Sequence, residues 1–280
     1  MMMTSPAEPL TRALLREWGL PDPGDSKKSR GEVIVVGGSR RSPGAVLLSG
    51  EAALRVGAGR VGLAVPEEIE PGLGLAFPEA GVYVLPGSGD LDDALLSALG
   101  SADAVLFGTG FADPDTTRSA LVRLADADVG CLVLDAFALG VLADIERSIL
   151  PPDLIINANT DEAALLLQRD LTDDRVADVR EIAERFEAVV HCYGVVAAPD
   201  GRAWQAESGG PGLGTAGSGD ILAGAITGFA ALGVGSERAA AWGGFVHARA
   251  GDRRQEAMGT GFLAGDLLPE LTAVIVDVLE

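Results

Sequence analysis

Short apolar runs alternate with amphipathic stretches along the first two hundred residues. The apolar runs are rich in Val, Ile and Leu and are bounded by Gly, Pro or polar residues, which is typical of buried strands. Strands are therefore predicted at 32–38, 60–66, 82–87, 102–110, 131–139, 153–159 and 188–199. Helical periodicity predicts helices at 43–59, 91–101, 115–128, 160–171 and 175–186. Such alternation indicates an α/β fold with a mostly parallel sheet and helices on both faces.

The pattern changes near residue 200. Residues 200–207 are predicted to form an exposed antiparallel piece that turns at Asp200 and Gly201, and three helices are predicted after Asp220, at 221–233, 236–257 and 263–279. No proline-rich or serine-rich linker and no repeat divides the chain. We therefore expect residues 1–280 to form a single domain, with residues 1–30 as an extended or loosely docked N-terminal segment.

Composition excludes several classes of partner. The 280-residue chain is 48% apolar and carries a formal net charge of −20, so its surface repels nucleic-acid backbones and anionic lipid. Neither a secretory signal nor an 18-residue apolar span is visible in the sequence, which predicts a cytoplasmic protein. Cys131 and Cys192 lie in apolar runs and are predicted to be buried thiols.

The segment "GPGLGTAGSGDILAG" at 210–224 places glycines directly before a carboxylate and a helix. It lies too late in the chain for a dinucleotide-binding turn and lacks the lysine of a P-loop. Glycines there can turn the amides of Gly217, Ser218 and Gly219 toward an anion. Asp220 can then either cap the helix or act as a general base toward a hydroxyl, and the residues alone leave both open.

Several other residues are weaker candidates. Asp135 follows an apolar strand, where it either orients a substrate or caps the next turn. Arg40 and Arg41 lie in a loop after the first strand and either meet a phosphate or pair with surface acids. The two histidines of the chain, His191 and His247, are interpreted as packing residues.

The ordered motifs resemble a known family. "GTAGSGDILAG" resembles the anion-hole and catalytic-aspartate motif of the ribokinase-like superfamily, and within it the ADP/ATP-dependent NAD(P)H-hydrate dehydratases. "LFGTGF", "VLDAFAL" and "VHARAGD" are similar to further motifs of those enzymes, in the same order, so the resemblance runs from about residue 31 to the end. It implies a ribokinase-like α/β fold.

The resemblance also implies a reaction and a set of partners. The enzymes repair hydrated NADH or NADPH, using ADP or ATP with Mg²⁺ that bridges the phosphates. Asp220 would take the hydroxyl proton, and the amides of Gly217, Ser218 and Gly219 would hold the transferred phosphoryl group. Ala45 and Gly110 match positions that approach the hydrated nicotinamide. A homo-oligomer is expected on the same ground.

Two positions depart from the family pattern. Asn159 stands where the family has a histidine against the substrate, and Tyr193 precedes Gly194 where the family has a lysine beside the nucleotide. Residues 159–162 also fit the N-x-x-E pattern of ribokinase-type kinases, in which Glu162 would organise Mg²⁺ through water, although helix capping explains the same residues. Two alternatives therefore remain: a small-molecule kinase of this fold, and a nucleotide-binding relative with impaired catalysis.

Overall fold

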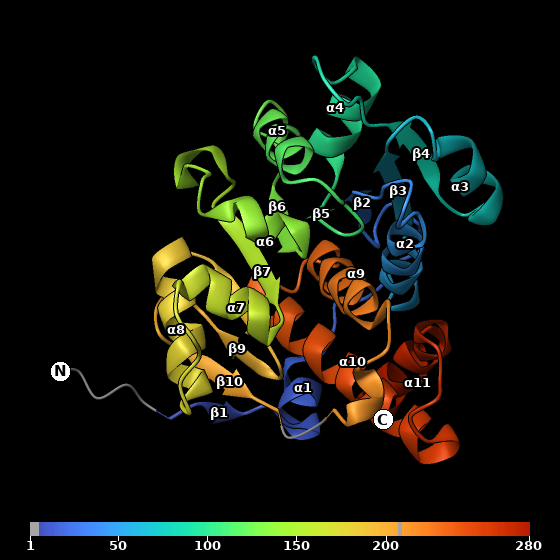
Figure 1. Ribbon diagram of the computed structural model, residues 1–280. Helices are drawn as coiled ribbons and strands as arrows, with labels where there is room; N and C mark the ends of the chain where they lie inside the picture. The colour runs from blue at the N-terminus through green and yellow to red at the C-terminus, as the bar shows by residue number, and fades with distance from the viewer. Residues whose placement is uncertain (1–5, 207–208) are drawn as a thin grey trace.

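A single sheet runs through the part of the chain that the computed structural model describes, residues 6–206 and 209–280 (Figure 1). Its strand order is β1-β10-β9-β8-β7-β6-β5-β2-β3-β4. The strands are β1 (Glu8–Pro9), β2 (Glu32–Val36), β3 (Arg60–Val65), β4 (Gly81–Val84), β5 (Ala104–Phe107), β6 (Cys131–Asp135), β7 (Asp153–Ala158), β8 (Val189–Cys192), β9 (Val195–Ala197) and β10 (Ala203–Gln205). Strands β2 to β8 pair in parallel, whereas β9 is antiparallel to both of its neighbours.

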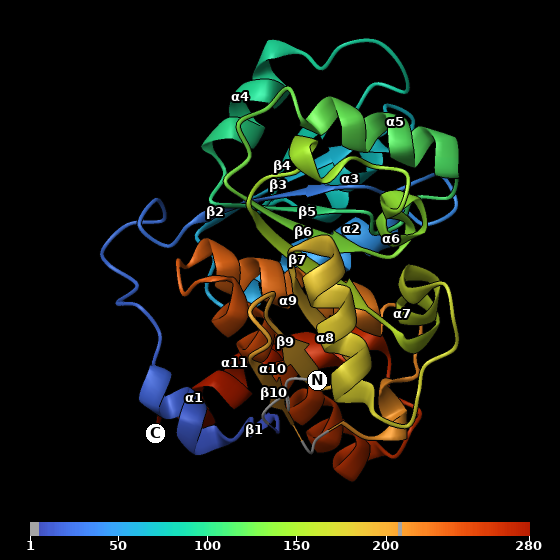
Figure 2. The same cartoon turned by 90° about the vertical axis from the view of Figure 1, so that its left-hand side faces the viewer.

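Helices cover both faces of this sheet, as Figures 1 and 2 show. They are α1 (Arg12–Trp18), α2 (Gly44–Arg55), α3 (Glu70–Ala76), α4 (Asp93–Ser101), α5 (Pro114–Leu124), α6 (Phe137–Leu142), α7 (Thr160–Leu167), α8 (Arg175–Phe186), α9 (Ser218–Ala231), α10 (Ser236–Met258) and α11 (Leu267–Leu279). None of the helices in the described ranges has both the length and the apolar character needed to cross a bilayer.

Two apolar cores lie on opposite faces of the sheet because side chains alternate along each strand. Val33 and Val35 of β2 belong to the core on the side of α2, α9, α10 and α11, whereas Ile34 and Val36 belong to the core on the side of α4 to α8. Both faces are apolar along the same strands, which explains why the sequence shows continuous apolar runs there. The predicted α/β fold with a mostly parallel sheet is confirmed.

The N-terminal segment departs from the expectation of loose docking. Strand β1 pairs in parallel with β10, and the side chain of Leu15 in α1 is fully buried. The ring of Trp18 meets that of Trp204 edge-on, with centroids 6.0 Å apart. Residues 8–18 therefore pack against the sheet. In the antiparallel piece, Ala203 and Trp204 are buried, whereas Asp200, Arg202 and Gln205 are exposed. Residues 1–5 and 207–208 lie outside the described ranges.

Two predicted strands end earlier than their apolar runs. The run at 188–199 is a hairpin, because Tyr193 and Gly194 both adopt left-handed backbone angles, with φ of 45° and 79°, and reverse the chain between β8 and β9. The run at 131–139 leaves the sheet after Asp135, where Ala136 has φ of 50° and α6 begins. Both early ends place polar residues at one edge of the sheet.

Helix α9 packs against α2 at backbone contact distance. A Cβ atom on Gly224 would lie 2.1 Å from the carbonyl oxygen of Ser49, so only glycine fits at this crossing. Beside it, Ser49 Oγ lies 3.0 Å from the carbonyl oxygen of Ala45 and 2.9 Å from that of Asp220, and its single O–H proton is shared between these two acceptors. The crossing therefore fixes the position of the first turn of α9, which carries Asp220.

Replacement of Gly224 by alanine should separate these two helices. We expect Gly224→Ala to lower the free energy of unfolding by about 1–3 kcal/mol, as overpacked cores do. Urea denaturation followed by circular dichroism measures the change. Gly140→Ala is the matched control, because Gly140 lies inside α6 with open space around its Cα, and alanine should raise stability by up to about 1 kcal/mol. Equal effects of the two substitutions would contradict the close crossing.

Candidate active site

A cleft of about 980 Å³ opens at the carboxyl ends of β6, β7 and β8. The first turns of α7 and α9 and the β8–β9 turn contribute to its walls, so many backbone amides and strand-end side chains face one space. Ligands of open α/β sheets bind beyond the carboxyl ends of the strands. Of the residues predicted for the site, the cleft collects Asp135, Asn159, Glu162, Tyr193, Gly194, Gly217, Ser218, Gly219 and Asp220.

Asp220 lines this cleft from the first turn of α9. Thr109, a buried residue two positions beyond the end of β5, donates a hydrogen bond from its Oγ1 to Asp220 Oδ1. Burial raises the pKa of Asp220 above its ordinary value, and the hydrogen bond from Thr109 opposes that rise. The second carboxylate oxygen remains available to accept a proton. Sequence reasoning missed Thr109, although the residue lies inside the quoted "LFGTGF" motif.

The predicted anion hole is only partly free for a ligand. Gly217 takes the left-handed conformation, φ 91°, at the N-cap of α9. The Ser218 amide donates to the Thr215 carbonyl at 3.2 Å, so it is engaged within the turn. Among the hydrogen bonds formed within the described residues, neither Gly217 nor Gly219 donates one from its amide. Two amides beside Asp220 therefore remain for an anion, at the positive end of a helix dipole.

A chain of buried polar side chains forms the floor of the cleft. Asn157 Nδ2 donates to Asp135 Oδ1 at 2.8 Å, and Asn157 Oδ1 lies 2.9 Å from His191 Nδ1. Burial, followed by the charge of Glu162, raises the pKa of Asp135 well above its ordinary value, and the Asn157 bond opposes this. Sequence reasoning did not single out Asn157, and its only signal was an amide inside an apolar run.

The second histidine supports the first turn of α9. His247 Nε2 lies 3.0 Å from Ser218 Oγ, and both side chains are buried. Burial lowers the pKa of both His191 and His247 to about 4, so both rings are neutral at pH 7. The prediction that both histidines are satisfied packing residues is confirmed, and both in addition line the cleft. Cys131 and Cys192 are free and buried, as predicted.

Asn159 and Glu162 form a capping box at the start of α7. Asn159 Oδ1 accepts the Glu162 amide and Glu162 Oε2 accepts the Asn159 amide, both at 2.9 Å. The capping interpretation of residues 159–162 is therefore realised, and it occupies one oxygen of each side chain. The pKa of Glu162 is raised above its ordinary value, and burial is the largest cause. Its other carboxylate oxygen is the kind of hard ligand that Mg²⁺ prefers.

Tyr193 and Gly194 form the tip of the β8–β9 turn at the rim of the cleft. Tyr193 is 62% exposed, and the guanidinium carbon of Arg175 lies 5.8 Å from the centroid of its ring. Arg175 also lines the cleft, so a cation stands beside the position where the family pattern has lysine. Nothing in the sequence connected Arg175 with Tyr193, because they are 18 positions apart and most of α8 and all of β8 lie between them.

Ala45 and Gly110 lie together but are not part of the cleft lining. A Cβ atom on Gly110, whose φ is 72°, would lie 2.9 Å from the Ala45 Cβ. Gly110 directly follows Thr109, so the pair borders the Thr109–Asp220 contact from outside the cleft. Arg40 and Arg41 are exposed and are also absent from the lining.

Comparisons with known proteins agree with this architecture. Residues 33–273 match the family model described as NAD(P)H-hydrate dehydratase. The ADP-dependent (S)-NAD(P)H-hydrate dehydratase of Xanthomonas campestris is 42% identical, over 98% of each chain. A ribokinase-like superfamily protein from Enterococcus faecalis superposes with a TM-score of 0.83 at 21% identity, covering 97% of this chain and 96% of its own.

A second solved structure has the same fold. The ADP/ATP-dependent NAD(P)H-hydrate dehydratase from Bacillus subtilis, co-crystallised with ATP and Mg²⁺, has a TM-score of 0.81 at 22% identity and covers 100% of both chains. At this level of identity, the likeness establishes the ribokinase-like fold.

The two histidines offer a direct test of the buried cleft floor. We expect both imidazole C–H signals in NMR spectra to titrate near pH 4, because burial disfavours the charged ring. The lowered pKa values also make the histidines contribute stability above pH 6.5 that is lost as the pH falls toward 4. Since the chain has two histidines, His247→Gln assigns both signals. Titration of either ring near pH 6.5 would contradict its burial.

Proposed function

The chain belongs to the NAD(P)H-hydrate dehydratase family, and from that membership we propose that it dehydrates hydrated NADH or NADPH with ADP or ATP as phosphoryl donor. The observation that carries the proposal is the placement of Asp220, which lies in the cleft beside two unengaged amides and is held by Thr109. Homo-oligomerisation and a cytoplasmic location are part of the same proposal.

The geometry supports a two-stage reaction. Asp220 accepts the proton of the ring hydroxyl, the hydroxyl oxygen forms a bond to the terminal phosphorus of the nucleotide, and the shortened nucleotide leaves with the bonding electrons. The C–O bond then breaks with phosphate as the leaving group. A proton lost from the neighbouring ring carbon restores the double bond. The amides of Gly217 and Gly219 would stabilise the negative charge on the transferred phosphoryl group.

Glu162 is the cleft residue proposed to hold a metal ion. Glu162 would hold Mg²⁺ through water, with its free carboxylate oxygen, while the nucleotide phosphates supply the other oxygens. When bound, Mg²⁺ neutralises charge on the phosphates. Asp135, fixed by Asn157, would orient the substrate or the hydrated ion from the floor of the cleft.

The kinase alternative gains no separate support from residues 159–162, because the capping box accounts for them. Asn159 would meet the substrate only through the polar atoms that the cap leaves free. Tyr193 and Gly194 would border the nucleotide at the rim of the cleft. Ala45 and Gly110 would approach the nicotinamide ring from the other side of the Thr109–Asp220 contact.

Loss of the Asp220 carboxylate should abolish repair. We expect Asp220→Asn to reduce kcat by at least about a hundredfold, because the amide cannot accept the hydroxyl proton. Recovery of NADH absorbance from hydrated NADH with ADP or ATP measures the rate. Asp126→Asn is the matched control, because Asp126 is exposed and lies outside the cleft. Full activity of Asp220→Asn would refute the assignment of the base.

Thr109 should set the pH range in which this base works. The Thr109 bond lowers the pKa of Asp220 against the effect of burial, so Thr109→Val should raise that pKa. Activity needs the deprotonated carboxylate, and it falls as the pH drops through its pKa. The acid limb of kcat against pH should therefore move to higher pH in Thr109→Val. Thr109→Ser keeps the hydroxyl and should keep the wild-type profile, and an unshifted valine profile would show that another group sets the limb.

A further inference from the structure

The charge balance of the cleft is unfavourable for a phosphorylated ligand. Four carboxylate side chains line it, those of Asp135, Glu162, Asp220 and Asp252. Burial keeps His191 and His247 neutral, since it lowers the pKa of each to about 4. Among the described lining residues, Arg175 is the one lysine or arginine. Any polyphosphate that enters this space meets a single permanent positive charge from the protein.

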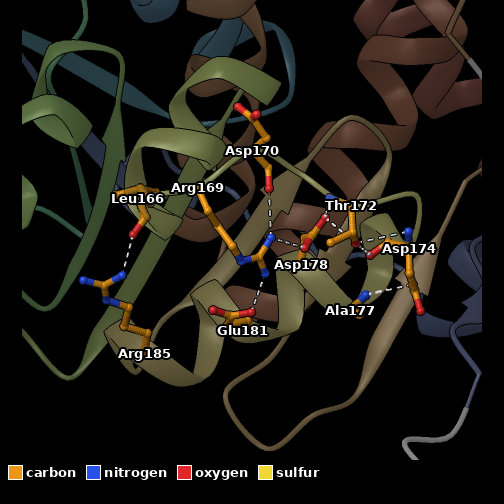
Figure 3. A network of polar contacts seen from close by, with 9 residues as sticks. All are labelled: Leu166, Arg169, Asp170, Thr172, Asp174, Ala177, Asp178, Glu181 and Arg185. Carbon is orange, nitrogen blue, oxygen red and sulfur yellow. Dashed lines mark hydrogen bonds and ion pairs between the residues drawn. The ribbon is translucent and has the colours of Figure 1, made fainter.

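Polar contacts connect the loop before α8 with the first turns of that helix, as Figure 3 shows. Asp178, which is 1% exposed, accepts hydrogen bonds from Arg169 Nη1 at 2.8 Å and from the Thr172 amide at 2.7 Å. Asp174 caps α8 by accepting the amide of Ala177. Arg175 is the first residue of α8, directly after this cap. The network therefore fixes the backbone from which the Arg175 side chain extends.

The Arg175 guanidinium itself is uncommitted. It makes no hydrogen bond or ion pair with any described residue, in contrast to neighbouring Arg169, which binds both Asp178 and Glu181. Its only partner within the described ranges is the ring of Tyr193, at 5.8 Å from the ring centroid. A guanidinium on an aromatic ring keeps its N–H donors free to bind phosphate oxygens in pairs.

Tyr193 adopts a backbone conformation that is unusual for its residue type. Its φ of 45° lies in the left-handed region, which costs a bulky side chain about 1 kcal/mol or more. The ring is nevertheless 62% exposed at the rim of the cleft, so burial of the ring does not offset this cost. In this conformation the Tyr193 ring contacts the Arg175 guanidinium at the entrance of the cleft.

We propose that Arg175, held against the ring of Tyr193, binds the phosphate chain of the adenine nucleotide and supplies the protein's positive charge to it. The inference rests on the proposed function and names a residue that positions the phosphoryl donor. Arg175 then favours nucleotides over nucleosides.

Direct binding measurements test this assignment. At constant Mg²⁺, Arg175→Gln should weaken the binding of ADP and AMP by about tenfold, the loss expected for one charge-assisted contact. Adenosine, measured by saturation-transfer NMR, should bind the variant and the wild type equally. Arg175→Lys should keep part of the ADP affinity, because lysine retains the charge but not the paired N–H donors. The charge-matched control is Arg16→Gln, because Arg16 is exposed on α1 and lies outside the cleft lining.

A second experiment moves the positive charge from position 175 to position 193. Position 193 borders the same cleft, so Tyr193→Lys in the Arg175→Gln background should restore ADP binding to within about threefold of wild type. The accompanying kinetic readout is a KM for ADP that rises in Arg175→Gln and falls again in the double variant, with kcat changed much less. Restoration by a charge at a different backbone position would not follow if Arg175 merely stabilised the fold.

Several outcomes would overturn the inference. Equal ADP affinity in wild type and Arg175→Gln, with repair intact, would refute it and leave the proposed function standing. An equal loss of ADP and adenosine binding would assign Arg175 to the base or to the fold. A raised KM for hydrated NADH with unchanged ADP binding would assign it to the dinucleotide instead. A wild-type protein that neither binds ADP nor recovers NADH would refute the inference and the proposed function together.

Discussion

The position of α9 relative to the sheet is the constraint on which the candidate site depends. Gly224 lets α9 approach the backbone of α2, and Ser49 bonds to the Asp220 carbonyl next to that crossing. Thr109, from the end of β5, holds the Asp220 side chain. The backbone of Asp220 is thus fixed by α2, and its side chain is fixed by the residue that follows β5. Such double fixation keeps a proton acceptor beside the unengaged amides without a large loss of conformational freedom on ligand binding.

Burial gives the cleft its chemical character. It raises the pKa values of Asp135, Glu162 and Asp220, and it lowers those of both histidines. The cleft therefore contains proton acceptors and neutral rings rather than a set of cations. A phosphorylated ligand must then be stabilised by amide dipoles, by Mg²⁺ and by Arg175. These local positive groups explain how a chain with a net charge of −20 can accept an anionic substrate in this cleft.

The two positions that depart from the family pattern have different structural outcomes. Asn159 is part of the capping box of α7, where its side-chain oxygen accepts a hydrogen bond from the Glu162 amide. Tyr193 is placed at the tip of a hairpin with its ring free to contact Arg175. The first departure therefore narrows what Asn159 can offer a substrate. At the second departure, the lysine of the family pattern is absent. Tyr193 in the β8–β9 turn instead contacts Arg175 at the start of α8.

The sequence by itself determined the class of the fold, because apolar runs and helical periodicity are local properties that survive without tertiary contacts. It also predicted a candidate site at Asp220 and the glycines before it, because a dense glycine run ahead of a helix is visible in one short segment. Only the tertiary structure decided which distant residues meet. Thr109 lies in a glycine-containing motif and Asn157 in an apolar run, but no local pattern shows which residues they contact. The contact of Arg175 with Tyr193 depends on the hairpin within the apolar run at 188–199. Docking of residues 8–18 likewise depends on pairing with β10, a strand some two hundred positions away, which no local pattern encodes.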